Sequence, residues 1–203
     1  MIEAHLTIET NEGQMSTFVV RPESEGPFPV ILFLMDAPGK REELHDMARR
    51  VAATGYYVML PNLYYRDVPS FTIHREDPVS AKYMAQLMDN LSNAMVSRDA
   101  LTLLEHAESD ASANTDVVGV TGYCMSGPFA LWLAADYPEK IRAAASIHGV
   151  RLATDADDSP HTRAAEINGE ILVLAAEFDD WVDRPHYDRL TEALTNAEVS
   201  HNA

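Results

Sequence analysis

The sequence predicts an α/β protein with a mostly parallel sheet flanked by helices on both faces. Short apolar runs alternate along the chain with segments of helical periodicity. Runs such as 29–35 are apolar throughout, which is typical of strands covered on both faces. A chain of 203 residues with 46% hydrophobic content can bury one sizeable core but not two. We therefore expect a single domain over residues 1–203.

The first strands are expected to be antiparallel. Residues 2–8 alternate between apolar and polar side chains, and residues 16–20 form a second short strand before Pro22. The buried strand 29–35 follows and ends in the loop signal Asp36-Ala-Pro-Gly39. This order predicts an antiparallel start that leads into the parallel sheet.

The next elements are a helix and a buried strand. Residues 42–54 place their apolar side chains on one face, and Gly55 is suited to end that helix. A strand over 56–60 and a polar surface loop over 67–78 follow. Residues 80–107 have the pattern of one or two amphipathic helices.

The second half of the chain repeats the strand and helix pattern. We expect strands at 117–122, 143–147 and 171–175, with helices at 125–135 and 184–194. In a parallel sheet, functional groups gather at the C-terminal ends of the strands. Candidate functional residues are therefore expected directly after each strand.

Composition excludes several classes of function. The chain has 32 acidic and 15 basic residues, a net charge of -17 that would repel nucleic acid and anionic membranes. No apolar run is long enough to span a membrane, and the N-terminus lacks the pattern of a signal peptide, so we expect a cytoplasmic protein. The lone cysteine cannot form an internal disulfide, and the scattered histidines predict no metal site. No cofactor is expected.

Cys124 has the surroundings of a catalytic nucleophile. The strand 117–122 runs into Gly122-Tyr-Cys-Met-Ser-Gly127 and then into a helical pattern, the setting of a nucleophile elbow. Small residues at 122 and 126 would relieve clashes in so tight a turn. The helix N-terminus is expected to favour the thiolate. The alternative is a buried cysteine that acts only as a small hydrophobe. The position of Cys124 between a strand and a helix favours the role of nucleophile.

Three segments resemble the dienelactone hydrolase family. They are the elbow at 122–127, Pro61-Asn-Leu-Tyr-Tyr-Arg66 and Glu177-Phe-Asp-Asp-Trp181, and the resemblance runs from about Pro29 to the end. It implies the α/β-hydrolase fold and a hydrolase of carboxylic esters or lactones. Ser126 stands where the family usually has glycine, and serine is small enough for the turn.

The resemblance assigns the catalytic acid to Asp179, which follows the strand 171–175. Asp180 and Asp183 are close competitors. All three residues could instead be ordinary loop or capping carboxylates, a role that suits Asp183 best.

No catalytic histidine can be assigned. After Asp179 only His186 and His201 remain. His186 is expected within a helix, and His201 follows 197–200, which has the pattern of the start of a last strand. The family places its histidine in the loop after that strand. We therefore expect the C-terminal strand, histidine loop and helix to be missing, which leaves either a fragment or a protein without its base.

The expected catalytic centre also includes Asp36, Ala37 and Met125. The resemblance implies that Asp36 controls the proton of the thiol, although an aspartate before Ala-Pro-Gly is equally a turn residue. The oxyanion hole of this fold uses the N–H after the nucleophile and one from the loop after the third strand, here Met125 and Ala37. Pro38 has no N–H and cannot serve.

His148 and Trp181 are candidates for substrate binding, with hydrogen-bonded or packing roles as alternatives. Tyr64 and Tyr65 are expected to line a pocket or to pack. No motif identifies an arginine that would hold a substrate carboxylate.

We expect an ester or lactone hydrolase that forms an acyl-cysteine and acts on a small molecule as a monomer or homodimer. The alternatives are a non-catalytic protein of the same fold that binds a ligand or partner, and an enzyme completed by residues of a partner chain.

Overall fold

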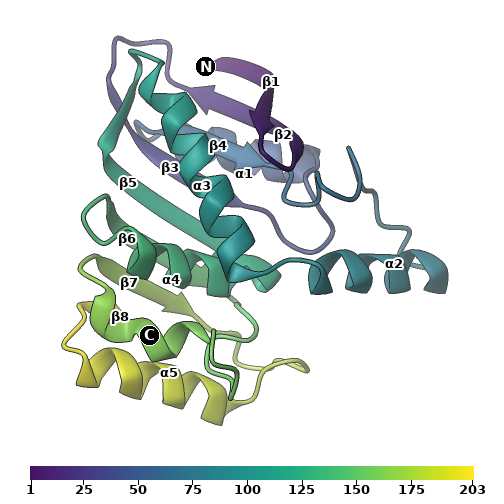
Figure 1. The fold of residues 1–203 in the computed structure, drawn as a ribbon, viewed down its shortest axis with the longest axis vertical. Helices are drawn as coiled ribbons and strands as arrows, with labels where there is room; N and C mark the ends of the chain where they lie inside the picture. Colours follow the sequence, from purple (N-terminus) through teal and green to yellow (C-terminus); the bar gives the residue numbers. More distant parts are fainter.

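The sheet has eight strands and confirms the expected fold class. The computed structural model describes residues 1–203, and its strands lie in the order β1-β2-β4-β3-β5-β6-β7-β8 (Figure 1). β1 and β2 are antiparallel to each other, β2 is antiparallel to β4, and the remaining neighbours are parallel. The strands are β1 Ile2–Thr10, β2 Gly13–Arg21, β3 Phe28–Leu34, β4 Tyr57–Pro61, β5 Ala113–Tyr123, β6 Ile141–Ile147, β7 Glu170–Leu174 and β8 His201–Asn202.

Helices cover both faces of the sheet. In Figure 1, α3, α4 and α5 lie in front of the sheet and α1 lies behind it. No helix is both long and apolar enough to cross a membrane. The helices are α1 Glu42–Ala52, α2 Pro78–Asp89, α3 Asn93–Glu108, α4 Gly127–Asp136 and α5 Arg184–Asn196, with 3-10 segments at Cys124–Ser126 and Pro160–Glu166.

Local capping sets the helix boundaries. Asp77 accepts a hydrogen bond from the Val79 N–H and begins α2, directly after the expected polar loop. Ser92 caps α3 in the same way, so the helical stretch expected over 80–107 forms two helices. The buried apolar side chains form one cluster that joins these helices to the sheet.

Two sequence-based boundaries are wrong. The helix expected from Met125 begins at Gly127, because Cys124 has a φ of 53° and starts a 3-10 turn instead. Residues 197–200 do not begin a strand, because Glu198 has a φ of 57° and reverses the chain after α5. The strand starts only at His201.

Candidate active site

Cys124 lies at the C-terminal end of β5 in a strained turn. Its φ of 53° is in the left-handed region, which is uncommon for any residue with a side chain. A Cβ atom on Gly122 would lie 2.1 Å from the Ser126 carbonyl oxygen, and one on Gly127 would lie 2.5 Å from the Gly149 Cα atom. The elbow therefore requires glycine at both positions.

Ser126 ties the elbow to the neighbouring strand. Its side chain is fully buried, and its hydroxyl donates a hydrogen bond to the carbonyl oxygen of Met35, directly after β3. A glycine could not make this contact. The hydroxyl thus gives the serine at this position a physical role.

The environment of Cys124 favours the neutral thiol. Burial raises the pKa of Cys124, and the negative charges of Asp36 and Asp179 raise it further. The hydrogen bond from the Met125 N–H lowers this pKa but does not outweigh the other effects. The expected effect of the helix N-terminus is thus present in the Met125 N–H, but burial and the two carboxylates outweigh it.

The loop after β3 forms a tight turn beside the elbow. The Gly39 N–H donates to the Asp36 carbonyl oxygen over 3.0 Å, and the Ala37 N–H has no acceptor within the chain. The Asp36 carboxylate accepts two hydrogen bonds from the Arg41 guanidinium, at 2.5 and 3.0 Å. Arg41 also donates to the Gly39 carbonyl oxygen at 3.0 Å, so it fixes both ends of the turn. No pattern in the sequence predicted this role of Arg41.

The acid loop follows β7. Asp179 is half-buried and accepts a hydrogen bond from the Trp181 N–H over 2.8 Å, and its charge acts on Cys124. Asp180 is exposed, while Asp183 accepts from the His186 N–H and caps α5. The Trp181 side chain is 88% exposed, so the structure places it on the surface.

His148 directly follows β6 and is exposed at the C-terminal edge of the sheet. Its φ is 42°, and its backbone N–H donates to the Leu174 carbonyl oxygen at the end of β7 over 2.7 Å. The imidazole centroid lies 6.4 Å from that of the Tyr123 ring, next to the nucleophile in sequence. The structure thus brings His148 to the rim of the site without a hydrogen bond to Cys124.

His186 and His201 are engaged elsewhere. The Nε2 atom of His186 accepts hydrogen bonds from the backbone N–H groups of Leu152 at 2.8 Å and Ala153 at 3.2 Å. His201 pairs with Ile171 near the start of β7, at the edge of the sheet opposite Cys124. Neither histidine is placed to take a proton from the thiol.

Tyr187 is a site residue that the sequence did not reveal. It comes from α5, is buried, and its hydroxyl lies 3.4 Å from the Gly149 carbonyl oxygen. Burial raises the pKa of Tyr187, and the charge of Asp179 raises it further. Its helical spacing with Leu190 and Leu194 would have predicted only a core position.

A pocket of about 230 Å³ adjoins the elbow. Met125 forms part of its wall, together with Val150, whose N–H donates to the Cys124 carbonyl oxygen. Arg151 lines the pocket and pairs with Asp89 at 3.0 Å. The apolar lining residues are Met88, Leu91, Met125, Pro128, Phe129 and Val150.

A mostly parallel sheet with a strained cysteine between a central strand and a helix defines an α/β-hydrolase-like protein. The sequence matches the dienelactone hydrolase family over residues 15–203, so the chain belongs to that family. The match begins earlier than the expected start near Pro29. Family membership identifies the chain as a hydrolase of ester or lactone bonds.

Relatives agree with this assignment, and a solved structure shares the fold. A protein named "Putative carboxymethylenebutenolidase" from Methylorubrum extorquens is 27% identical over 201 residues, which cover 97% of this chain and 67% of the relative. A protein of the same name from Synechocystis is 25% identical, with 97% and 80% covered. The crystal structure titled "Putative Dienelactone Hydrolase" from Klebsiella pneumoniae shares the fold, with a TM-score of 0.85, 22% identity, and 98% of this chain and 82% of that chain covered.

Proposed function

We propose that Cys124 is the nucleophile of a carboxylic ester or lactone hydrolase that works through an acyl-cysteine. The observation that carries this proposal is the φ of 53° at Cys124, directly after β5. Such strain is retained where the surrounding structure fixes it, and it concentrates at functional sites. The family assignment supplies the class of bond that is attacked.

The reaction needs the thiol to lose its proton, because the neutral form predominates at rest. The sulfur then adds to the ester carbonyl carbon, and the oxyanion accepts hydrogen bonds from the N–H groups of Met125 and Ala37. Collapse of the tetrahedral intermediate breaks the C–O bond, and the leaving alkoxide takes up the proton that the thiol gave up. Water then adds to the thioester, and the carboxylic acid and the Cys124 thiol are released.

Nearby residues supply the remaining roles in this proposal. Asp36 controls the proton of Cys124, since its charge acts on the thiol. Asp179 is the catalytic acid that would orient a base. His148 contacts the substrate at the rim, and the pocket beside Met125 receives the apolar part of a small ester or lactone. Trp181 is proposed to contact the substrate from the acid loop, where its side chain faces solvent.

The test is hydrolysis of p-nitrophenyl acetate by wild type and by Cys124→Ala, with intact mass recorded through the reaction. We expect release of p-nitrophenol and an acetyl adduct in the wild type, and neither in the variant. Ser109→Ala is a matched control, because it removes an exposed hydroxyl at the end of α3.

Continued turnover supports the full cycle. One equivalent of product with a stable adduct supports the nucleophile but not deacylation, and then favours a ligand-binding role or completion by a partner chain. Equal rates in wild type and Cys124→Ala would refute the proposal.

We also propose a cytoplasmic protein that acts as a monomer or homodimer, because a lone reactive thiol suits a reducing compartment. Cell fractionation and size-exclusion chromatography with light scattering test these two points. Recovery only in a membrane fraction, or only as a higher oligomer, would contradict them.

A further inference from the structure

The segment Pro61-Asn-Leu-Tyr-Tyr-Arg66 has no part in the mechanism above, yet it reaches the site. Tyr64 is 1% exposed. Its hydroxyl lies 2.9 Å from the Ala37 carbonyl oxygen and 3.1 Å from the Met125 sulfur. Tyr64 therefore contacts the two residues whose N–H groups would hold the oxyanion.

We propose that Tyr64 is a positioning residue that fixes the direction of the oxyanion-hole amides. This inference rests on the proposed function, since it assigns a role within the same site. Tyr64 would not touch the substrate. It would act through the backbone of Ala37 and the side chain of Met125.

Two hydrogen bonds fix the backbone on both sides of the Ala37 Cα atom. The peptide that carries the Ala37 N–H is held by the bond from the Gly39 N–H to the Asp36 carbonyl oxygen. The next peptide is held by the Tyr64 hydroxyl. With both peptide planes fixed, the Ala37 N–H has one direction.

The Tyr64 hydroxyl is suited to remain a donor. Burial raises the pKa of Tyr64, and the charge of Asp36 raises it further, so the phenol stays protonated at neutral pH. Its ring makes an edge contact with Phe71, with the centroids 6.1 Å apart. Phe71 in turn packs beside Gly39 in the oxyanion turn.

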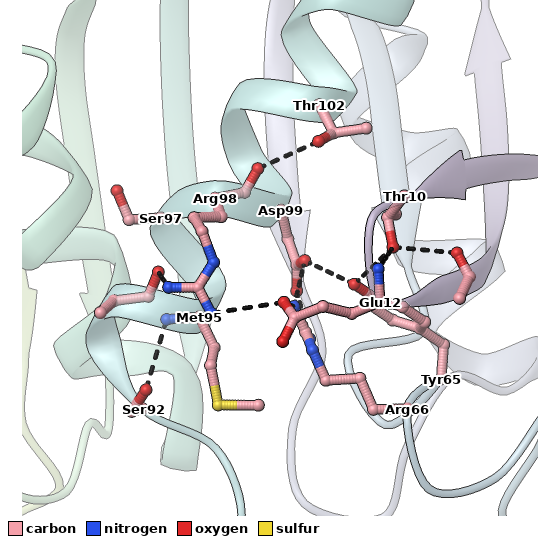
Figure 2. A network of polar contacts seen from close by, with 12 residues as sticks. Thr10, Glu12, Tyr65, Arg66, Ser92, Met95, Ser97, Arg98, Asp99 and Thr102 are labelled. Atoms are coloured by element: carbon pink, nitrogen blue, oxygen red, sulfur yellow. Dashed lines mark hydrogen bonds and ion pairs between the residues drawn. The ribbon is translucent and has the colours of Figure 1, made fainter.

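The residues around Tyr64 anchor it to the fold. The Tyr64 N–H donates to the Asn62 Oδ1 atom at 3.1 Å. The next residue makes a contact away from the site: the Tyr65 hydroxyl donates to the Asp99 carboxylate at 2.8 Å (Figure 2). Arg66 makes two further bonds to Asp99, at 2.9 and 2.7 Å. Asp99 belongs to α3, so the segment is tied to that helix while Tyr64 points to the site.

The experiment compares two reactions of the same thiol in wild type and Tyr64→Phe. Acylation by p-nitrophenyl acetate passes through an oxyanion, whereas alkylation by iodoacetamide does not. We expect acylation to fall about 10-fold, less than the loss of a whole oxyanion donor, while alkylation changes by less than about 2-fold. Tyr57→Phe is the matched control, because Tyr57 is also buried but lies at the start of β4.

Each outcome bears on one proposal. Wild-type acylation in Tyr64→Phe, or an equal fall in both reactions, overturns the positioning role. Failure of the wild type to acylate contradicts the proposed function instead. If Tyr64→Phe does not fold, Phe71→Leu removes the ring that packs edge-on against Tyr64 and so loosens the hold of the same hydroxyl on the Ala37 carbonyl oxygen. An unchanged acylation rate in that variant would also overturn the inference.

Discussion

Gly122 and Ser126 approach so closely that a Cβ atom on Gly122 would lie 2.1 Å from the Ser126 carbonyl oxygen. Gly122→Ala must therefore displace the backbone of the elbow. We expect a loss of about 3 kcal/mol in the free energy of unfolding, together with loss of esterase acylation. Urea unfolding and the p-nitrophenyl acetate assay measure the two effects.

Gly119→Ala is the control for this substitution. Its added Cβ would meet the tip of the Ile31 side chain, at 2.6 Å, instead of backbone. A side-chain tip can move, so the loss should be clearly smaller. Equal losses for the two variants would mean that the elbow is not the tighter site.

The Cys124 thiol should react only at high pH. Because the pKa of Cys124 is raised, alkylation by iodoacetamide should reach half its maximal rate above the value of about 8.5 of an ordinary cysteine. Asp36→Asn removes a negative charge that raises this pKa, so the half-maximal pH should fall. Asp180→Asn, at an exposed site, should leave it unchanged. A half-maximal pH of the wild type below that of free cysteine would contradict a raised pKa of Cys124.

The buried ion pair between Asp99 and Arg66 should matter for stability. Their side chains are 2% and 11% exposed, and Asp99→Asn would leave the guanidinium with only the more exposed Glu12 as a charged partner. We expect a loss of about 3 kcal/mol in urea unfolding. Asp89→Asn breaks the exposed pair with Arg151 and should cost about 0.5 kcal/mol. Similar effects of the two substitutions would count against a structural role of the buried pair.

His186 should make stability depend on pH. Burial lowers the pKa of His186 in the folded protein, and its neutral Nε2 atom accepts two backbone hydrogen bonds. The contribution of His186 to the free energy of unfolding is therefore present above the pKa of about 6.5 that histidine has in the unfolded chain. It is lost as the pH falls through the lower pKa of the folded protein.

His186→Gln keeps an acceptor that does not titrate, and the other histidines are common to both proteins. The free energy of unfolding of the wild type should thus fall relative to that of the variant between about pH 8 and pH 5. Parallel pH profiles would show that His186 does not hold the loop through its neutral form.

The sequence predicted the elements that depend on local pattern. The apolar run before Asp36 is β3, and the small residues around Cys124 form a strained turn after β5. Errors arose where one residue in the left-handed region changed the chain direction. Because of Cys124, α4 begins later in the sequence than expected, and because of Glu198 the last strand does too. A periodicity argument cannot detect such single dihedral angles.

By itself, the sequence determined the α/β class, the family resemblance and the position of the elbow, because each follows from periodicity or from contiguous residues. Only the tertiary structure decided the protonation of Cys124, the pairing of Asp36 with Arg41, and the contact of Tyr64 with Ala37 and Met125. These depend on burial and on distances between separate loops. Such distances are fixed when the strands assemble, and the order of residues along the chain does not reveal them.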